Sequence, residues 1–160
     1  MTTSSHWQPA ATLATLAARA ALNARLRHFF AARGVLEVET PQLCHHSGTD
    51  PHLHPVTAAY QPYPQATVQT LYLQTSPEFA MKKLMAGGHG IGMSKIVQLC
   101  RVWRDRERSP LHHPEFTMLE WYRADADYGA PPTAFQDTAR AHLEADYPIP
   151  ADSRFEFGEP

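Results

Sequence analysis

The strongest constraint on the fold is a pair of strand-like runs, residues 95–104 and 115–123. About ten polar residues lie between them. Both runs are rich in the β-branched and aromatic side chains that fit a pleated, half-buried surface. A polar, proline-containing connection of this length joins neighbouring antiparallel strands most simply. We therefore predict a long β-hairpin within an antiparallel sheet.

Side chains on the second run alternate between the two faces of the sheet. The even-numbered positions place Phe116, Met118, Glu120 and Tyr122 in one row. Arg104 lies where the first run enters the loop. The loop adds charged and imidazole side chains: Asp105, Arg106, Glu107, Arg108, His112 and His113. Together these groups predict a site for a flat base, a phosphate chain and a small cationic group.

This arrangement favours the activation of a carboxylic acid by ATP. The guanidinium of Arg104 can bind the α-phosphate as a fork, and its charge is most effective when the reacting phosphorus gains negative charge. Phe116 can stack on adenine, while Glu107 and one of the histidines orient the base or the outer phosphates. Mg²⁺ is expected on the triphosphate, whose charge must be offset. Composition and pattern alone favour a solvated charged turn and ordinary packing of the strand aromatics over such a site.

The N-terminal part of the chain predicts a long helix followed by a strand. Residues 10–33 carry apolar side chains at helical spacing: Leu22, Leu26, Phe29 and Phe30. Gly34 supplies a helix stop. Residues 35–40 alternate like a strand, which Pro41 ends because proline cannot donate to a strand ladder.

The middle of the chain is less regular. Residues 44–68 show no sustained period, and we expect irregular structure there with one short strand near residues 56–60. A clearer strand follows at residues 69–74. A last helix is expected from residue 131 or 132 to about residue 146.

The run SPEFAMKKLMAGG predicts a short helix with both ends marked. Ser76 is the expected N-cap, and Pro77 suits the first helical position. Glu78 lies near the positive end of the helix dipole, and Gly87 or Gly88 closes the helix.

Composition indicates one globular domain. The chain has 160 residues, of which 43% are hydrophobic and 19% charged, and its formal charge of −2 argues against a dedicated nucleic-acid binder. The N-terminus lacks the pattern of a signal peptide, and Cys44 and Cys100 lie outside any CxxC motif. We therefore expect a cytoplasmic protein without disulfides.

Four histidines lie close together in the sequence: His45, His46, His52 and His54. They lack the ordered spacing of a zinc site, and no cysteine pair accompanies them. A polar loop is the favoured interpretation, and no metal ligands are expected in this chain.

The string RVWRDRERSPLHHPEFTMLEWYR resembles motif 2 of class II aminoacyl-tRNA synthetases, and GVLEVETPQL after a long helix resembles their motif 1. HHPEFTMLEWY and TSPEFAMKKL are similar to the lysine-specific branch, and most similar to its paralogues without an anticodon domain, the elongation factor P lysine ligases. The resemblance runs from about residue 7 to 128, with motif 1 at about 22–43 and motif 2 at about 99–123.

The resemblance implies an α+β fold, an antiparallel sheet flanked by helices, and a homodimer formed through motif 1. It makes Arg104 the catalytic residue that holds the α-phosphate. It implies ATP-binding roles for Arg104, Asp105, Arg106, Glu107, His112, His113 and Phe116. It also implies that the amino acid is bound by Ser76, Pro77, Glu78, Glu120 and Tyr122, with Glu78 near the substrate amino group.

The loop departs from the family pattern at two positions. Synthetases usually have RxE after the first strand of motif 2, whereas this chain has Arg106 at that point and Glu107 one residue later. His113 stands where the family often has Asn. The residue that replaces the usual glutamate is therefore left open.

Only about 20 residues precede the motif 1 helix, so an anticodon-binding domain is not expected before it, and motif 3 is expected to be absent from these residues. We expect residues 1–160 to be the N-terminal part of a class II synthetase-like catalytic domain. The expected function is ATP-dependent activation of lysine or (R)-β-lysine as an adenylate, with transfer to a lysine side chain of elongation factor P. The alternatives are a truncated lysyl-tRNA synthetase and a non-catalytic dimerising or ligand-binding remnant. Neither a membrane nor tRNA is an expected partner.

Overall fold

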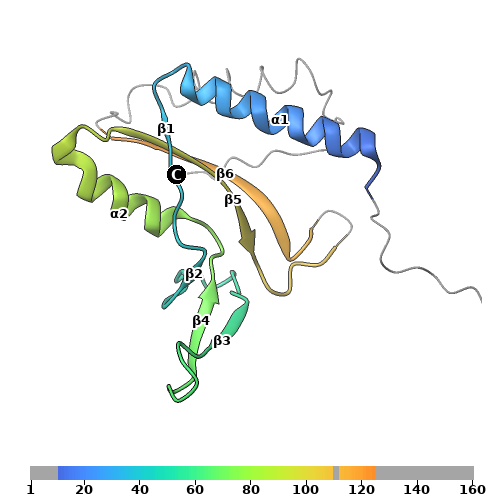
Figure 1. Cartoon of the computed structure of the whole chain (residues 1–160), viewed down its shortest axis with the longest axis vertical. Helices are drawn as coiled ribbons and strands as arrows, with labels where there is room; N and C mark the ends of the chain where they lie inside the picture. The colour runs from blue at the N-terminus through green and yellow to red at the C-terminus, as the bar shows by residue number, and fades with distance from the viewer. Residues whose placement is uncertain (1–10, 110–111, 125–160) are drawn as a thin grey trace, which may run out of the picture. The chain divides into compact units, whose positions relative to one another are not determined.

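The computed structural model describes residues 11–109 and 112–124. The chain divides into two units, Met1–Phe29 with Ala126–Pro160, and Phe30–Asp125. The described part of the first unit is the N-terminal portion of helix α1, and the second unit contains both sheets and helix α2 (Figure 1). The helix predicted near residues 131–146 lies outside the described residues.

Helix α1 spans Leu13–Ala31, close to the predicted bounds. Its N-cap is Thr12, whose Oγ1 accepts the Thr15 amide at 3.1 Å. At the other end the Val35 amide donates to the Phe30 carbonyl at 3.1 Å, and Gly34 has φ = 66°. This pattern is a Schellman motif, which needs a residue in the left-handed region. The helix and its glycine stop are therefore confirmed.

The predicted hairpin is confirmed almost to the residue. Strand β5 spans Lys95–Trp103 and strand β6 spans Glu115–Arg123, and they pair antiparallel over their whole length. Strand β1, Leu36–Glu37, completes this first sheet in the order β1-β5-β6. It runs parallel to β5, so this sheet is mixed at one edge. Parallel neighbours are possible because the chain between them is long enough for a crossover connection. The predicted α+β class and the antiparallel pairing of the hairpin are confirmed.

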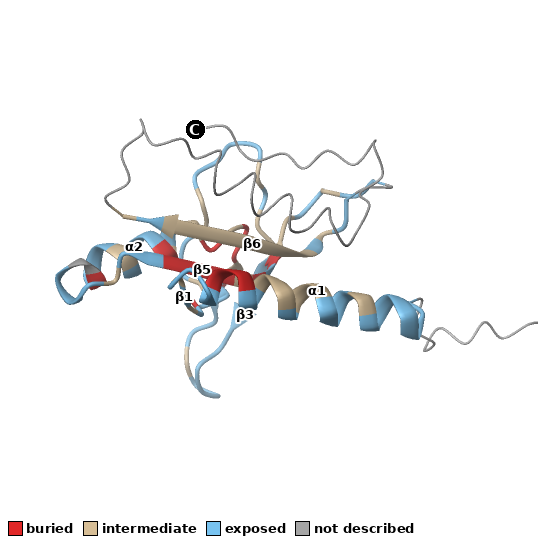
Figure 2. Cartoon of the chain, turned by 90° about the horizontal axis from the view of Figure 1, so that it is seen from above, coloured by how far each residue is buried: buried red, intermediate tan, exposed pale blue. Residues whose placement is uncertain are grey.

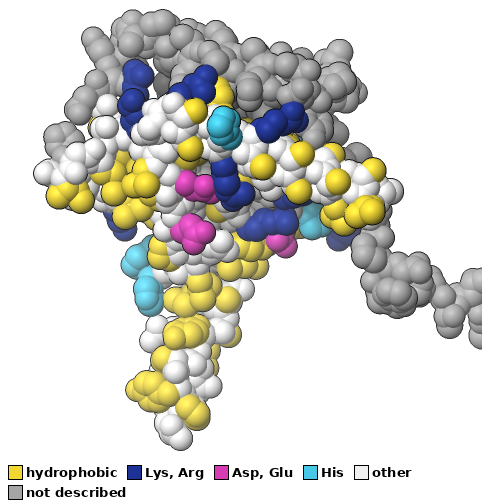
Figure 3. Space-filling model, turned by 45° about the horizontal axis from the view of Figure 1, so that its top comes forward, with side chains coloured by type: hydrophobic (Ala, Val, Ile, Leu, Met, Phe, Trp, Pro, Cys, Tyr) yellow, Lys and Arg dark blue, Asp and Glu magenta, His cyan; other side chains and the backbone are white. Residues whose placement is uncertain are grey.

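A second three-stranded sheet has the order β2-β4-β3 and is antiparallel throughout. Its strands are β2 (Leu43–Cys44), β3 (Thr57–Tyr60) and β4 (Gln69–Leu73). The short strand expected near residues 56–60 is therefore confirmed. Within these strands only Leu71 is buried. Apolar side chains, drawn in yellow, cover much of the lower part of the molecule in Figure 3. Several large apolar side chains are exposed on this sheet and on the connection between β3 and β4: Leu43, Tyr60, Tyr63 and Val68.

Gln74, just after β4, joins the two sheets. Its carbonyl accepts the Trp103 amide at 2.9 Å, and its Nε2 donates to the Arg101 carbonyl at 2.9 Å. The side chain of Gln74 is buried, with 6% of its surface exposed. A buried amide that bonds a neighbouring backbone fixes where the chain leaves β4, and residues 75–77 start from that point.

Helix α2 spans Glu78–Gly88 and continues into a short 3-10 helix, η1, at His89–Ile91. Gly88 ends α2 as predicted, and a Cβ built on it would lie 2.7 Å from the Cβ of Met93. A glycine with left-handed backbone follows the 3-10 helix, at Gly92 with φ = 83°. The 3-10 turn therefore delays the reversal of the chain by one turn.

The core lies mainly along β5, which forms the red band in Figure 2. Every even-numbered residue from Ile96 to Val102 is buried, whereas Lys95 and Arg101 on the opposite face are exposed. The ring of Phe30 is 1% exposed and lies 5.7 Å from the ring of Trp121. Among the described residues, no helix combines the length and the hydropathy needed to cross a membrane.

Candidate functional site

The predicted row of side chains on β6 lies on the buried face of the hairpin. Gln98 pairs with Glu120, and Ile96 pairs with Tyr122, so the even-numbered residues of both strands share one face. Helix α2 contacts both strands, and its N-terminal residues face Glu120. The period-two prediction of which β6 side chains point together is therefore confirmed.

Ser76 connects helix α2 to this face. Its Oγ donates to Glu120 Oε2 at 2.8 Å and accepts the Glu78 amide at 3.1 Å. The second contact is the N-cap predicted from the sequence. Pro77 lies directly before Glu78, the first residue of α2, and is almost fully buried; its carbonyl accepts the Met81 amide at 2.9 Å. The cap that starts the helix thus also holds a carboxylate in place.

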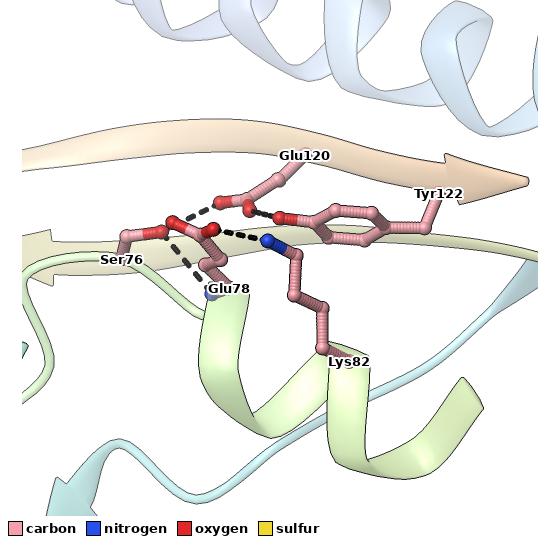
Figure 4. Close-up of polar contacts among 5 residues, drawn as sticks. All are labelled: Ser76, Glu78, Lys82, Glu120 and Tyr122. Carbon is pink, nitrogen blue, oxygen red and sulfur yellow. Dashed lines mark hydrogen bonds and ion pairs between the residues drawn. The ribbon is translucent and has the colours of Figure 1, made fainter. Parts of the chain in front are cut away.

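Five side chains form a polar group that we call the carboxylate cluster (Figure 4). Its members are Ser76, Glu78, Lys82, Glu120 and Tyr122. The Tyr122 hydroxyl donates to Glu120 Oε1, and Lys82 Nζ lies 2.5 Å from Glu78 Oε1. Two carboxylates and one ammonium leave a formal charge of −1 when both carboxylates are ionised. A further cation is therefore favoured here over an anion.

Tyr122 stays protonated well into the alkaline range. Burial of the phenol raises its pKa most, and the hydrogen bond to Glu120 and the charges of Glu120 and Glu78 raise it further. A protonated phenol can donate but carries no charge. Both Glu120 oxygens therefore accept hydrogen bonds from hydroxyl groups, and the carboxylate is held in one orientation.

A second group surrounds Arg104, one residue beyond the end of β5. Its Nε donates to the Thr75 carbonyl at 3.2 Å, and its Nη1 lies 3.6 Å from Glu107 Oε1. The guanidinium carbon is 5.2 Å from the centre of the Phe116 ring, a cation–π distance. Only 22% of the Arg104 side chain is exposed. Thr75 and Ser76 are consecutive, so the backbone links this group directly to the carboxylate cluster.

The contacts of the loop distinguish Glu107 from its neighbour Arg106. Glu107 turns toward Arg104, whereas Arg106 points its side chain into solvent, with 73% exposed. Arg106 has φ = 67°, an uncommon conformation for a residue other than glycine. Glu107 is therefore the carboxylate that the loop places beside the predicted phosphate-binding arginine.

The remaining loop residues bond to other groups of the protein, within the loop and next to it. Asp105 Oδ1 accepts the Arg106 amide at 2.9 Å, and the Asp105 amide donates to the His54 carbonyl at 2.7 Å. His112 Nδ1 lies 2.8 Å from Ser109 Oγ, and His113 Nδ1 lies 2.9 Å from the Glu115 carbonyl oxygen. Their predicted contacts with ATP stay predictions.

Sequence reasoning missed three residues that lie in or beside these two groups. Lys82 sits one helical turn after Glu78, and that spacing could have revealed the pair. Thr75 acts through its backbone carbonyl, which has no sequence signal. Gln98 is 2% exposed and lies opposite Glu120, which the hairpin register could have shown. The described residues contain no group of three or more His, Cys, Asp or Glu side chains that could hold a metal ion.

Comparison with known proteins identifies the family. Residues 6–135 match the family of tRNA synthetases class II (D, K and N). A protein of Erwinia tasmaniensis named "Elongation factor P--(R)-beta-lysine ligase" is 42% identical over 170 residues, which cover 95% of this chain and 51% of that protein. A protein of the same name from Histophilus somni is 41% identical over 159 residues, covering 99% of this chain and 48% of that protein.

A third protein of this name, from Haemophilus ducreyi, is 48% identical over 122 residues, covering 76% of this chain and 36% of that protein. The chain thus spans about half the length, or less, of these curated relatives. The family match covers most of the chain, and it includes the hairpin and helix that build the site described above. The chain belongs to the class II tRNA synthetase family of the aspartate, lysine and asparagine type.

Proposed function

We propose that the protein containing this chain is a ligase that activates lysine or (R)-β-lysine with ATP and transfers it to a lysine side chain of elongation factor P. The observation that carries the proposal is the adjacency of two complementary groups. The carboxylate cluster suits an ammonium, and the guanidinium of Arg104 suits a phosphate. A cationic amino acid and ATP are substrates that need these two groups together.

In the first step a carboxylate oxygen of the amino acid attacks the α-phosphorus of ATP, and pyrophosphate leaves. The product is a mixed anhydride, the aminoacyl-adenylate. Arg104 would stabilise the charge that develops on the phosphorus, and Phe116 would stack on the adenine. Glu78 and Glu120 would hold the substrate's ammonium groups, and Ser76 and Tyr122 would keep Glu120 oriented. Mg²⁺ is expected to accompany the triphosphate, and none of these steps is assigned to a protein-bound metal.

In the second step the neutral ε-amine of the acceptor lysine attacks the carbonyl carbon of the adenylate. An amide forms, AMP leaves with the bonding electrons, and the amine proton passes to solvent or to AMP. No covalent enzyme intermediate is needed. The names of the curated relatives support elongation factor P as the acceptor and (R)-β-lysine as the amino acid.

We also propose a cytoplasmic homodimer assembled through motif 1. The motif's strand β1 lies at the edge of its sheet within the described residues, with the side chain of Leu36 exposed. An exposed edge strand can pair with another copy of the same strand. The two cysteines are free, as a reducing compartment would require.

The test is amino-acid-dependent exchange of pyrophosphate into ATP by the full-length protein. We expect exchange with lysine or (R)-β-lysine and none with norleucine, which lacks the side-chain ammonium. Transfer is followed by the mass increase of elongation factor P, with tRNA as the competing acceptor. Charging of tRNA in place of elongation factor P would establish the synthetase alternative. Absence of exchange with every cationic amino acid would leave only a non-catalytic role.

A further inference from the structure

Lys82 places its own ammonium inside the carboxylate cluster. Its Nζ is 2.5 Å from Glu78 Oε1 and 5.7 Å from the centre of the Tyr122 ring. Figure 4 shows the side chain rising from α2 so that its end lies between Glu78 and Tyr122. Glu78 belongs to the helix and Tyr122 to β6, so this ammonium bridges two elements.

These two contacts are the ones an ammonium ligand needs. A carboxylate provides a charge-assisted hydrogen bond, and an aromatic face attracts a cation. A lysine side chain ends in the same group as free lysine, a primary ammonium on a flexible alkyl stem. Lys82 therefore satisfies the same groups of the protein that a substrate ammonium would satisfy.

The ion pair between Lys82 and Glu78 is also easily separated. Side-chain exposure is 55% for Lys82 and 42% for Glu78, so water reaches both partners. Exposed ion pairs at this helical spacing contribute little stability, and separating them costs little. Lys82 can swing into solvent without loss of core packing, because more than half of its side chain is already exposed. By contrast, Met81, the preceding residue, is fully buried.

We propose that Lys82 is an internal stand-in for the substrate ammonium: it neutralises Glu78 in the free protein, and the cationic amino acid displaces it on binding. The inference rests on the proposed function, because it assumes that Glu78 and Tyr122 receive a substrate cation. Its consequence is competition. Substrate binding is weakened by the free energy needed to move Lys82 aside, and removing that ammonium strengthens binding.

A purely supporting role for Lys82 predicts the opposite sign. If the lysine only orients Glu78, its removal leaves the carboxylate misplaced and weakens the binding of lysine. If the pair only adds to helix stability, its removal leaves binding unchanged. The direction of the change in affinity therefore separates a competitor from a supporting residue.

The experiment compares Lys82→Met in the full-length protein with wild type by calorimetric titration of lysine, (R)-β-lysine and norleucine. Methionine keeps an unbranched, flexible side chain and removes the charge. The matched control is Lys83→Met, which changes an exposed lysine about 100° further round the same helix. Lys82→Arg is the second variant, because it retains a cation at the same position. Circular dichroism and thermal melting confirm that each variant is folded.

We expect the Kd of the cationic amino acids to fall roughly three- to tenfold in Lys82→Met, the scale of an exposed ion pair plus one cation–π contact. Lys82→Arg and Lys83→Met should stay close to wild type, and the response to norleucine should not change. If wild type binds lysine and Lys82→Met has an unchanged or higher Kd, the proposed role of Lys82 is overturned but the proposed function is not. Binding by neither wild type nor Lys82→Met overturns both.

Discussion

The hydroxyl of Ser76 donates a hydrogen bond to Glu120 Oε2 at 2.8 Å, across 44 positions of the sequence. Ser76 Oγ also accepts a hydrogen bond from the Glu78 amide at the start of α2. One side chain therefore positions both carboxylates of the cluster, Glu78 through the helix cap and Glu120 directly. A small change at Ser76 should affect the fold and the site together.

Replacing Ser76 with alanine should lower the free energy of unfolding by about 1–2 kcal/mol. Loss of an N-cap costs about 0.5–2 kcal/mol, and the half-buried Glu120 also loses a donor. Urea unfolding monitored by circular dichroism measures the change. Ser94→Ala is the matched control, because Ser94 is exposed and contributes its carbonyl to the hydrogen bond from Ala124. Equal stabilities for the two variants would show that Ser76 is not the cap.

Replacing Arg104 with alanine in the full-length protein should slow pyrophosphate exchange by roughly 10²–10³-fold, or 2.7–4 kcal/mol in the barrier. The physical reason is the loss of a fixed charge beside the reacting phosphorus. Arg104→Lys should also be impaired, since an ammonium cannot replace the forked guanidinium.

Arg101→Ala provides the control for Arg104. Arg101 is on the opposite face of β5, where its Nη1 lies 3.7 Å from Glu115, and it is half exposed. Exchange by this variant should stay close to wild type. An Arg104→Ala protein within threefold of wild type would place the phosphate-binding arginine elsewhere.

Local patterns in the sequence were enough to predict the hairpin and the helix ends. Period-two alternation gave the shared face of Glu120 and Tyr122, because a strand has no other way to orient its side chains. Ser76 and Gly34 could be assigned because capping requires particular side chains or a left-handed backbone. These features depend on neighbours within a few residues.

Long-range features could not be predicted in this way. The parallel pairing of β1 with β5 and the junction at Gln74 depend on where distant segments meet. The hydrogen bond from Arg104 to the Thr75 carbonyl involves a backbone atom, which every residue carries. The Glu78–Lys82 spacing was visible, but the Tyr122 ring that makes the pair relevant to the site comes from another element.

The ionisation of Tyr122 should make the fold sensitive to alkaline pH. Burial and the neighbouring carboxylates raise its pKa in the folded protein, whereas an unfolded tyrosine titrates near about 10. Above that pH the unfolded chain binds fewer protons than the folded one, so this contribution to stability is present below about pH 10 and is lost as pH rises.

The stability of Tyr122→Phe should therefore fall less steeply with pH than that of wild type between roughly pH 9.5 and 11.5, a range that brackets the pKa of an unfolded tyrosine. Urea unfolding at each pH gives the slopes. Tyr63→Phe is the control, since that ring is 61% exposed. Identical slopes for wild type and Tyr122→Phe would contradict a raised pKa at Tyr122.

Phe30 tests whether the end of α1 is anchored to the hairpin. Its ring is 1% exposed and lies 5.7 Å from Trp121, which is on the face of β6 opposite to the carboxylate cluster. Phe30→Ala removes a buried ring and should lower the free energy of unfolding by about 3–5 kcal/mol. Ile91→Ala is the control, because Ile91 is 84% exposed and should change stability by less than about 0.5 kcal/mol.

Phe30 contacts the face of β6 opposite to the carboxylate cluster, so a Phe30→Leu protein that stays folded should retain the wild-type Kd for lysine. A clearly higher Kd for lysine in that folded variant would show that the two faces of the sheet are coupled.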